Sequence, residues 1–124
     1  MPGLQPLTAV LGQIEAVGDR RTEINFLNIG NLNAVVANSP AITVTNSFVF
    51  LSSAGGTQQI NQINGGEQGD LLFLVSGGNI SMRDTFAGAA NLRLAGHFNN
   101  MGFGDTMVLL FGGSTWVELS RSNN

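Results

Sequence analysis

The side chains that could perform acid–base chemistry are few and scattered along this chain. His97 is the single histidine, and no partner for a general base stands at a recognisable spacing from it. The eight carboxylates are spread mainly over expected turns and the N-terminal region, so no pair suited to glycoside hydrolysis can be identified. No serine lies in a nucleophile elbow. We therefore predict that the chain is not an enzyme, that it has no catalytic residues and that His97 is structural.

The sequence also lacks a recognisable phosphate-binding or metal-binding pattern. Gly77-Gly78-Asn79 and Gly112-Gly113-Ser114 lack the Lys-Ser/Thr pair and the following helix that define a phosphate-binding loop, so we interpret both as turns. With one histidine, no cysteine and no alternating Asp loop, the sequence shows no zinc or calcium pattern. We predict no metal and no cofactor.

Two kinds of residue leave alternatives open. Trp116 could stack on a ligand, although its place in an expected C-terminal strand favours a role as a core or interface anchor. The charged residues Arg83 and Asp84, and Glu118 with Arg121, could pair at a rim or interface, or they could be solvated loop charges.

The chain is unusually poor in charge. Of its 124 residues, 10% are charged, against about 25% in an average globular domain. It contains no lysine, and 43% of its residues are hydrophobic, which argues against disorder. Because a weakly charged surface favours association, we expect much of this surface to lie against partners.

Net charge and hydropathy exclude two classes of partner. The formal net charge of −3 lacks the basic footprint of a nucleic-acid-binding protein, so we predict no nucleic-acid partner. No run of 18 apolar residues is present, so we predict no membrane span.

The length fits one domain with an N-terminal extension. We divide the chain into an arm over residues 1–23 and a β-domain over residues 24–124. Apolar residues of the arm recur at helical spacing, and a short helix or an extended segment both stay open. As a hypothesis, the residues that contact a partner from this arm are Leu7, Val10, Leu11, Ile14 and Val17.

From Ile24 onward, short β-like runs alternate with glycine-containing turns. This pattern predicts an all-β fold, an antiparallel β-sandwich of jelly-roll type, and no solenoid period is found. The runs Leu71–Val75 and Met107–Phe111 are apolar on both faces, so one face of each is expected to meet another subunit or the middle of a sandwich.

We also expect the Asp of Gly69-Asp70 and of Gly104-Asp105 to accept backbone N–H groups in a turn before a strand. The hypothetical anchors of the core or of an oligomer contact are Phe73, Met107, Leu109, Phe111 and Trp116.

The C-terminal half, about Ile60 to Arg121, resembles a module of bacteriophage virion proteins: capsid cement (decoration) proteins, head fibres and tail-fibre tips. The resemblance is carried by segments 63–74, 78–84, 91–98 and 104–109 and by the ending 113–121, with its two Gly-Asp turns and terminal Trp-x-Glu-x-Ser-Arg. Proteins with this module tend to be β-sandwich homotrimers, so the resemblance implies a homotrimer here and supplies no catalytic residue.

Two functions follow from the resemblance as expectations. In the first, a trimeric cement protein binds the major capsid protein on the outer surface of an icosahedral phage capsid and stabilises the shell. In the second, the chain is the receptor-binding tip of a phage tail or head fibre. Because a fibre tip normally follows a repetitive shaft and none precedes this module, the sequence favours the cement protein.

Overall fold

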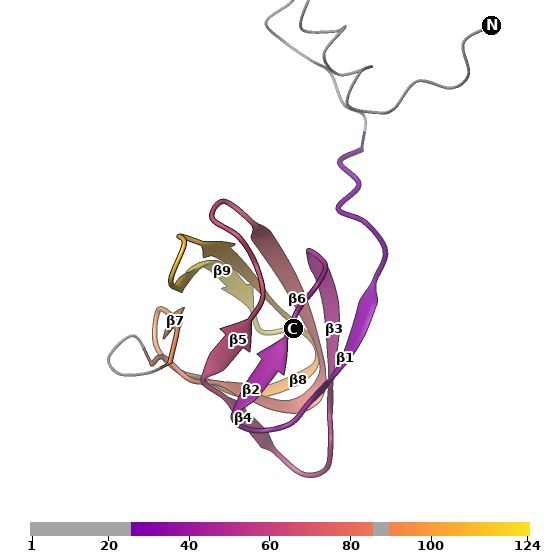
Figure 1. Ribbon diagram of the computed structural model, residues 1–124. Helices are drawn as coiled ribbons and strands as arrows, with labels where there is room; N and C mark the ends of the chain where they lie inside the picture. Colours follow the sequence, from indigo (N-terminus) through magenta and orange to yellow (C-terminus); the bar gives the residue numbers. More distant parts are fainter. Residues whose placement is uncertain (1–25, 86–89) are drawn as a thin grey trace, which may run out of the picture.

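The computed structural model describes residues 26–85 and 90–124, and every regular element in them is a β-strand (Figure 1). The arm residues Leu7 to Val17 lie outside the described residues. The strands are β1 (Asn33–Ala37), β2 (Ala41–Thr43), β3 (Phe48–Ser53), β4 (Gln58–Ile60), β5 (Gln62–Asn64), β6 (Leu71–Met82), β7 (Leu92–Arg93), β8 (Phe98–Phe111) and β9 (Trp116–Ser122).

The first part of the chain winds into stacked coils. Strand β1 pairs in parallel with β3, and β3 pairs in parallel with β6. On other sides of the coil, β2 pairs in parallel with β5 and β4 with the far end of β6. Each turn of the chain therefore lies on the preceding one, which is the architecture of a β-solenoid.

The expected antiparallel β-sandwich is therefore wrong, although the fold is all-β. Five strand pairs of the described residues are parallel and two are antiparallel. The sequence shows no fixed period because the coils differ in length. Val49 pairs with Asn33 of the preceding coil and with Leu74 of the following coil. More residues separate Val49 from Leu74 than separate Asn33 from Val49, so the two coils differ in length.

Strands β6 and β8 are long because each bends around a corner of the coil. The register of β6 against β8 shifts near Gly77, and Gly78 has a φ of 102°. A side chain at Gly77 would lie 2.9 Å from the backbone oxygen of Leu51, so glycine is needed where the neighbouring coil approaches closely. The predicted turn at Gly77-Gly78 is thus a bend within one strand.

Two antiparallel pairings complete the sheet. Strand β8 lies between β6 and β9, and β7 pairs with the outer edge of β9, so the sheet order is β1-β3-β6-β8-β9-β7. The Gly112-Gly113 turn joins β8 to β9 as a hairpin, as predicted: Phe111 pairs with Trp116, and the amide of Gly112 donates to the carbonyl of Thr115 at 2.9 Å.

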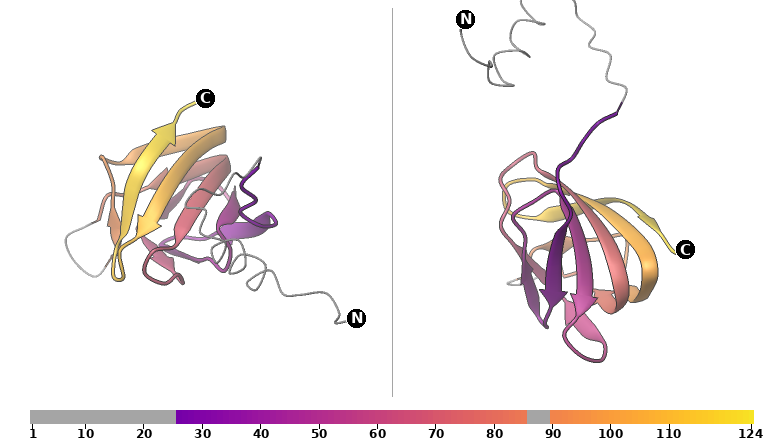
Figure 2. Two further views of the ribbon diagram at one scale, coloured as in Figure 1. Left: turned by 90° about the horizontal axis from the view of Figure 1, so that it is seen from above. Right: turned by 90° about the vertical axis from the view of Figure 1, so that its right-hand side faces the viewer.

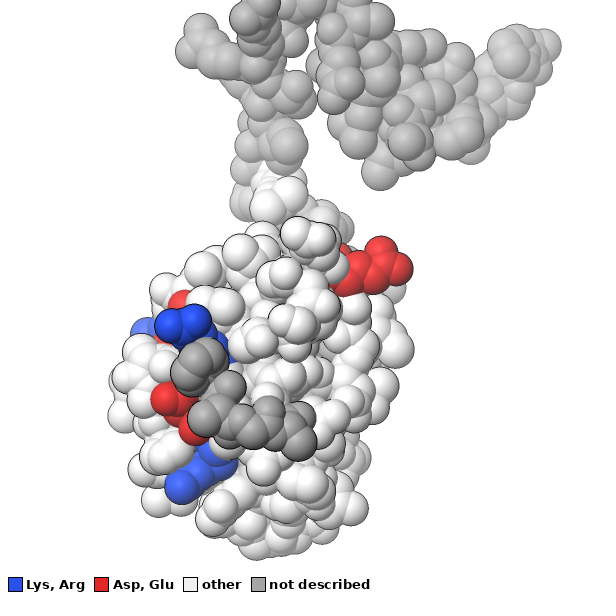
Figure 3. All heavy atoms as spheres, turned by 60° about the vertical axis from the view of Figure 1, so that its left-hand side comes forward, with Lys and Arg blue, Asp and Glu red and all other residues white. Residues whose placement is uncertain are grey.

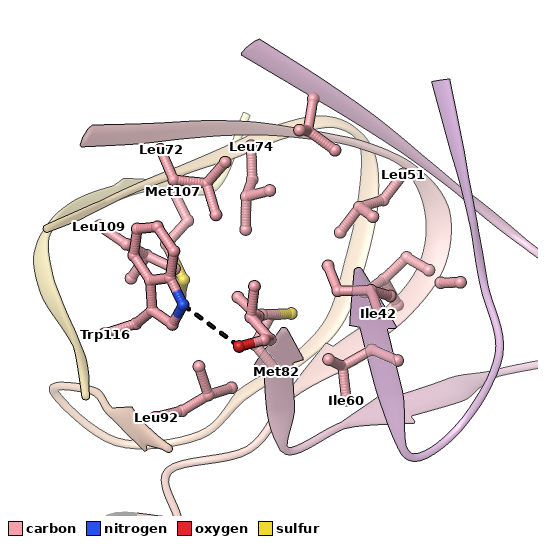
Figure 4. Close-up of a cluster of buried hydrophobic side chains, with 14 of the residues drawn as sticks. Ile42, Leu51, Ile60, Leu72, Leu74, Met82, Leu92, Met107, Leu109 and Trp116 are labelled. Carbon is pink, nitrogen blue, oxygen red and sulfur yellow. Dashed lines mark hydrogen bonds between the residues drawn. The ribbon is translucent and has the colours of Figure 1, made fainter. Parts of the chain in front are cut away.

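The core fills the inside of the coil with aliphatic and methionine side chains, the Phe98 ring and the Trp116 indole, and part of it is drawn in Figure 4. Trp116 is 1% exposed, and its Nε1 donates to the carbonyl of Ile63 at 3.3 Å. This bond satisfies the one polar atom of the largest core side chain. Met107 and Leu109 are fully buried beside it.

A candidate interaction face

The residues that could do chemistry have structural partners. The Nδ1 atom of His97 accepts the backbone N–H of Asp84 at 3.0 Å, and Asp84 Oδ1 accepts the N–H of Leu94 at 3.0 Å. His97 thus links the chain on the two sides of residues 86–89. Arg83 donates to Asn99 at 3.2 Å, so its hydrogen-bond partner is not the adjacent Asp84.

Glu118 and Arg121 form the one ion pair seen in the described residues, at 2.6 Å. The hydrogen bond between the two side chains lowers the pKa of the Glu118 carboxyl and raises the pKa of the Arg121 guanidinium. Glu118 also accepts the N–H of Ala95 at 2.8 Å. This pair joins β9 to the loop before β8.

The described residues contain no cluster of three His, Asp or Glu side chains that could hold a metal ion. The described residues contain no helical segment that could span a membrane. Every buried polar side-chain atom in this part of the chain has a hydrogen-bond partner.

The two Gly-Asp turns have the predicted hydrogen bond. Asp70 Oδ2 accepts the N–H of Glu67 at 2.8 Å, and Asp105 Oδ2 accepts the N–H of Gly102 at 2.7 Å. Asp70 directly precedes β6, as expected, whereas Asp105 lies inside β8 at its bend. The carboxylates at these positions therefore shape the backbone.

The outward side of the main sheet has an unusual composition. In β6, Leu72 and Leu74 point into the core, whereas Leu71, Phe73 and Val75 point outward. Because side chains alternate along a strand, the same division holds for the strands paired with it. This sheet is therefore apolar on both sides.

Cross-strand pairing aligns the outward side chains in rows. Leu71, Leu110 and Val117 form one row, and Phe48, Phe73, Val108 and Ser120 form the next. A third row contains Ala34, Phe50, Val75, Thr106 and Ser122. We call these three rows, with Val36, the outer face; none of its residues is charged. The right-hand view of Figure 2 shows β1, β3, β6 and β8 side by side, and β9 follows β8 in the sheet order.

Several apolar groups at this face are open to solvent. Phe103 is 79% exposed and contacts the Phe50 ring edge-on, with ring centroids 6.3 Å apart. Val36 on the edge strand β1 is 64% exposed. Five strands at about 4.8 Å spacing and five residues at about 3.3 Å rise give a face of about 400 Å². A contiguous apolar patch of this size marks an interaction site in many soluble proteins.

One charged side chain borders the outer face: the exposed Arg93 on β7 pairs with Val117 of the first row. In Figure 3, which brings the left-hand side of Figure 1 forward, most of the red and blue atoms lie together at the left, and one red group lies apart at the upper right, among large white areas. The Glu118–Arg121 pair bonds to backbone atoms of residues 95–97, away from the rows of the outer face.

The hypothetical anchors occupy different places. Met107, Leu109 and Trp116 are in the core, and Phe111 is partly buried against it with its ring 4.8 Å from that of Trp116. Phe73 lies on the outer face. Sequence reasoning did not select Phe50, Val36 or Phe103, because their shared face depends on parallel pairing between coils.

The surface also has a polar hollow of about 430 Å³ between the coil corners. It is lined by Ser39, Pro40, Thr57, Gln59, Asn61, Arg83 and Thr85.

The chain matches no protein-family model, no curated protein sequence and no solved structure. The geometry defines a class, a β-solenoid with an uncharged apolar outer face, and leaves the particular role to be proposed.

Proposed function

We propose that the chain is a non-enzymatic structural protein of a phage virion. In this proposal it is a trimeric cement protein that binds the major capsid protein on the outer surface of an icosahedral capsid and stabilises the shell. The observation that carries the structural role is the outer face, where apolar side chains of five strands form rows without a charge. The phage assignment rests on the resemblance of residues 60–121 to virion proteins.

Binding to the assembled shell would stabilise it by mass action. A protein that binds the shell and not its free subunits adds a stabilising free energy that grows with the logarithm of its concentration over its dissociation constant. A trimer presents three identical contacts, so weak single contacts combine into tight binding. A small protein without a catalytic centre is sufficient for this role.

The test compares the full chain with a variant lacking residues 1–23. Each is mixed with capsids assembled from the major capsid protein of the same genome, and the capsids are sedimented. We expect the full chain to sediment with capsids and the variant to remain a folded oligomer in the supernatant. Full binding by the variant would contradict the assigned role of the arm, and absence of binding by the full chain would contradict the cement function.

The polar hollow favours one alternative, the receptor-binding tip of a tail or head fibre. Its amide groups and the Arg83 guanidinium are suited to hydrogen-bonding a hydroxyl-rich host glycan. Binding of the purified chain to host cells, abolished by Gln59→Ala together with Arg83→Ala, would support this alternative. Binding to capsids and not to cells would exclude it.

A further inference from the structure

Residues 26–32 form an apolar segment that packs poorly on its own molecule. Phe26 is 90% exposed, Leu27 is 74% exposed and Leu32 is 51% exposed. In both Figure 1 and Figure 2 this segment runs from β1 away from the sheet. Its hydrogen bonds near β1 are local or long: the N–H of Gly30 donates to Asn28 at 2.8 Å, and Asn46 donates to the carbonyl of Asn31 at 3.5 Å.

Two uncovered apolar surfaces therefore exist on one molecule, the outer face and residues 26–32. The segment contains no charged residue, and neither does the outer face. When the two surfaces bury each other, apolar area is removed from water and no unpaired charge of either surface is buried. The charged residue that pairs directly with the outer face is Arg93, at its border beside Val117.

The dimensions of the two surfaces match. Seven extended residues span about 23 Å, and five strands at their usual spacing span about 24 Å. One segment is therefore long enough to cross the whole outer face. In Figure 1 the segment leaves the start of β1 and extends beyond its own sheet, so it does not cover its own outer face there.

A stable contact needs more area than the outer face alone provides, so we expect the outer face and residues 26–32 to form the contact together. A standard interface buries about 800 Å² per partner, which is about twice the outer face. The segment supplies additional apolar area without new charge. Contacts in which one patch meets a different patch on the next copy close into a ring when the rotation permits it, and a trimer is such a ring.

We infer that the partner of the outer face is a second copy of this chain, and that residues 26–32 of one copy lie across the outer face of the next. This inference rests on the proposed homotrimer and does not depend on the capsid. It assigns Phe26, Leu27 and Leu32 to a strap, and Phe73, Val75 and Val108 to the surface that the strap covers.

Disulfide cross-linking tests the inference cleanly because the chain has no cysteine. A tagged Leu27→Cys variant is co-expressed with an untagged Val108→Cys variant and oxidised. The control replaces Val108→Cys with Ala95→Cys, an exposed position at the loop bonded to Glu118. We expect a mixed disulfide between tagged and untagged chains, at least tenfold more abundant than in the control.

Three other outcomes separate the possible failures. A double variant, Leu27→Cys with Val108→Cys in one chain, that forms an internal disulfide as a monomer shows that the strap covers its own face and overturns the inference. A trimer by light scattering without the mixed disulfide overturns the strap and leaves the proposed homotrimer standing. A monomer at high concentration, with native circular dichroism, overturns both.

Discussion

Glu118 and Arg121 form a bidentate ion pair on strand β9. Arg121 Nε donates to Glu118 Oε2 at 2.7 Å, and Nη2 donates to Oε1 at 2.6 Å. The guanidinium also lies over the Phe98 ring at 4.7 Å and donates to the carbonyls of Gly96 and His97. One side chain thus holds β9, the start of β8 and the loop between β7 and β8 together.

Replacing Arg121 should destabilise the fold without unfolding it. Arg121→Ala removes the bidentate pair and leaves the Glu118 carboxyl, 5% exposed, with one backbone partner. We expect a loss of about 1–2 kcal/mol in the free energy of unfolding, measured by urea denaturation at pH 7. Arg121→Lys keeps the charge and loses the planar geometry, so most of the loss should remain. Equal stability of all three proteins would contradict this role.

The same pair makes stability depend on pH. Arg121 lowers the pKa of Glu118 in the folded state, so this carboxylate contributes stability above its unfolded pKa of about 4.3. That contribution is lost as the pH falls through the lower folded pKa. The stability difference between the wild type and Glu118→Gln should therefore be largest at pH 7 and shrink toward pH 3. A difference that grows on acidification would show that the pKa shift has the opposite sign.

Gly66 and Gly69 offer a matched test of packing against the core indole. Their φ angles are 94° and 93°, so alanine is similarly strained at both positions. A side chain at Gly66 would lie 2.6 Å from the Trp116 ring, whereas nothing lies within 4 Å at Gly69. We expect Gly66→Ala to destabilise the protein by about 1–3 kcal/mol more than Gly69→Ala in urea denaturation. Similar losses would mean that Trp116 moves aside freely.

Much of the local structure was predictable from the sequence. The runs Phe48–Leu51 and Leu71–Val75 lie inside β3 and β6, and the turn after Phe111 is a hairpin. These features depend on neighbouring residues, through side-chain alternation and the positive φ that glycine accepts. The apolar character of both faces of Leu71–Val75 also predicted apolar side chains on two sides of one sheet, and the structure places Leu71, Phe73 and Val75 on its outward side.

The arrangement of the strands was not predictable, for a physical reason. Side chains alternate with the same period in parallel and antiparallel strands, so Val49 and Leu74 carry no sign that they pair in parallel. The coil spacing is irregular, so no repeat marks the stacking. The glycines at 77–78 and 104, where the sequence predicted turns, lie at bends inside β6 and β8.

The outer face itself is tested by placing a charge on its middle strand, β6. Val75 lies in the third row, between Phe50 and Thr106, so Val75→Lys points a cation into the surface that we assign to a second copy. A lysine there cannot be buried without a counter-charge, which the uncharged strap and face do not supply. The assembly should therefore dissociate to single chains of 13.0 kDa, measured by light scattering after size-exclusion chromatography.

The matched control for this charge is Thr43→Lys, an exposed position on β2 off the outer face. It should keep the mass of the wild-type assembly, and both variants should keep wild-type circular dichroism because neither residue is in the core. If Val75→Lys also kept that mass, the outer face would not be the contact between copies. If the wild type itself were a stable monomer at high concentration, an apolar sheet face open to water would be tolerated, and the structural premise of the proposed function would fail.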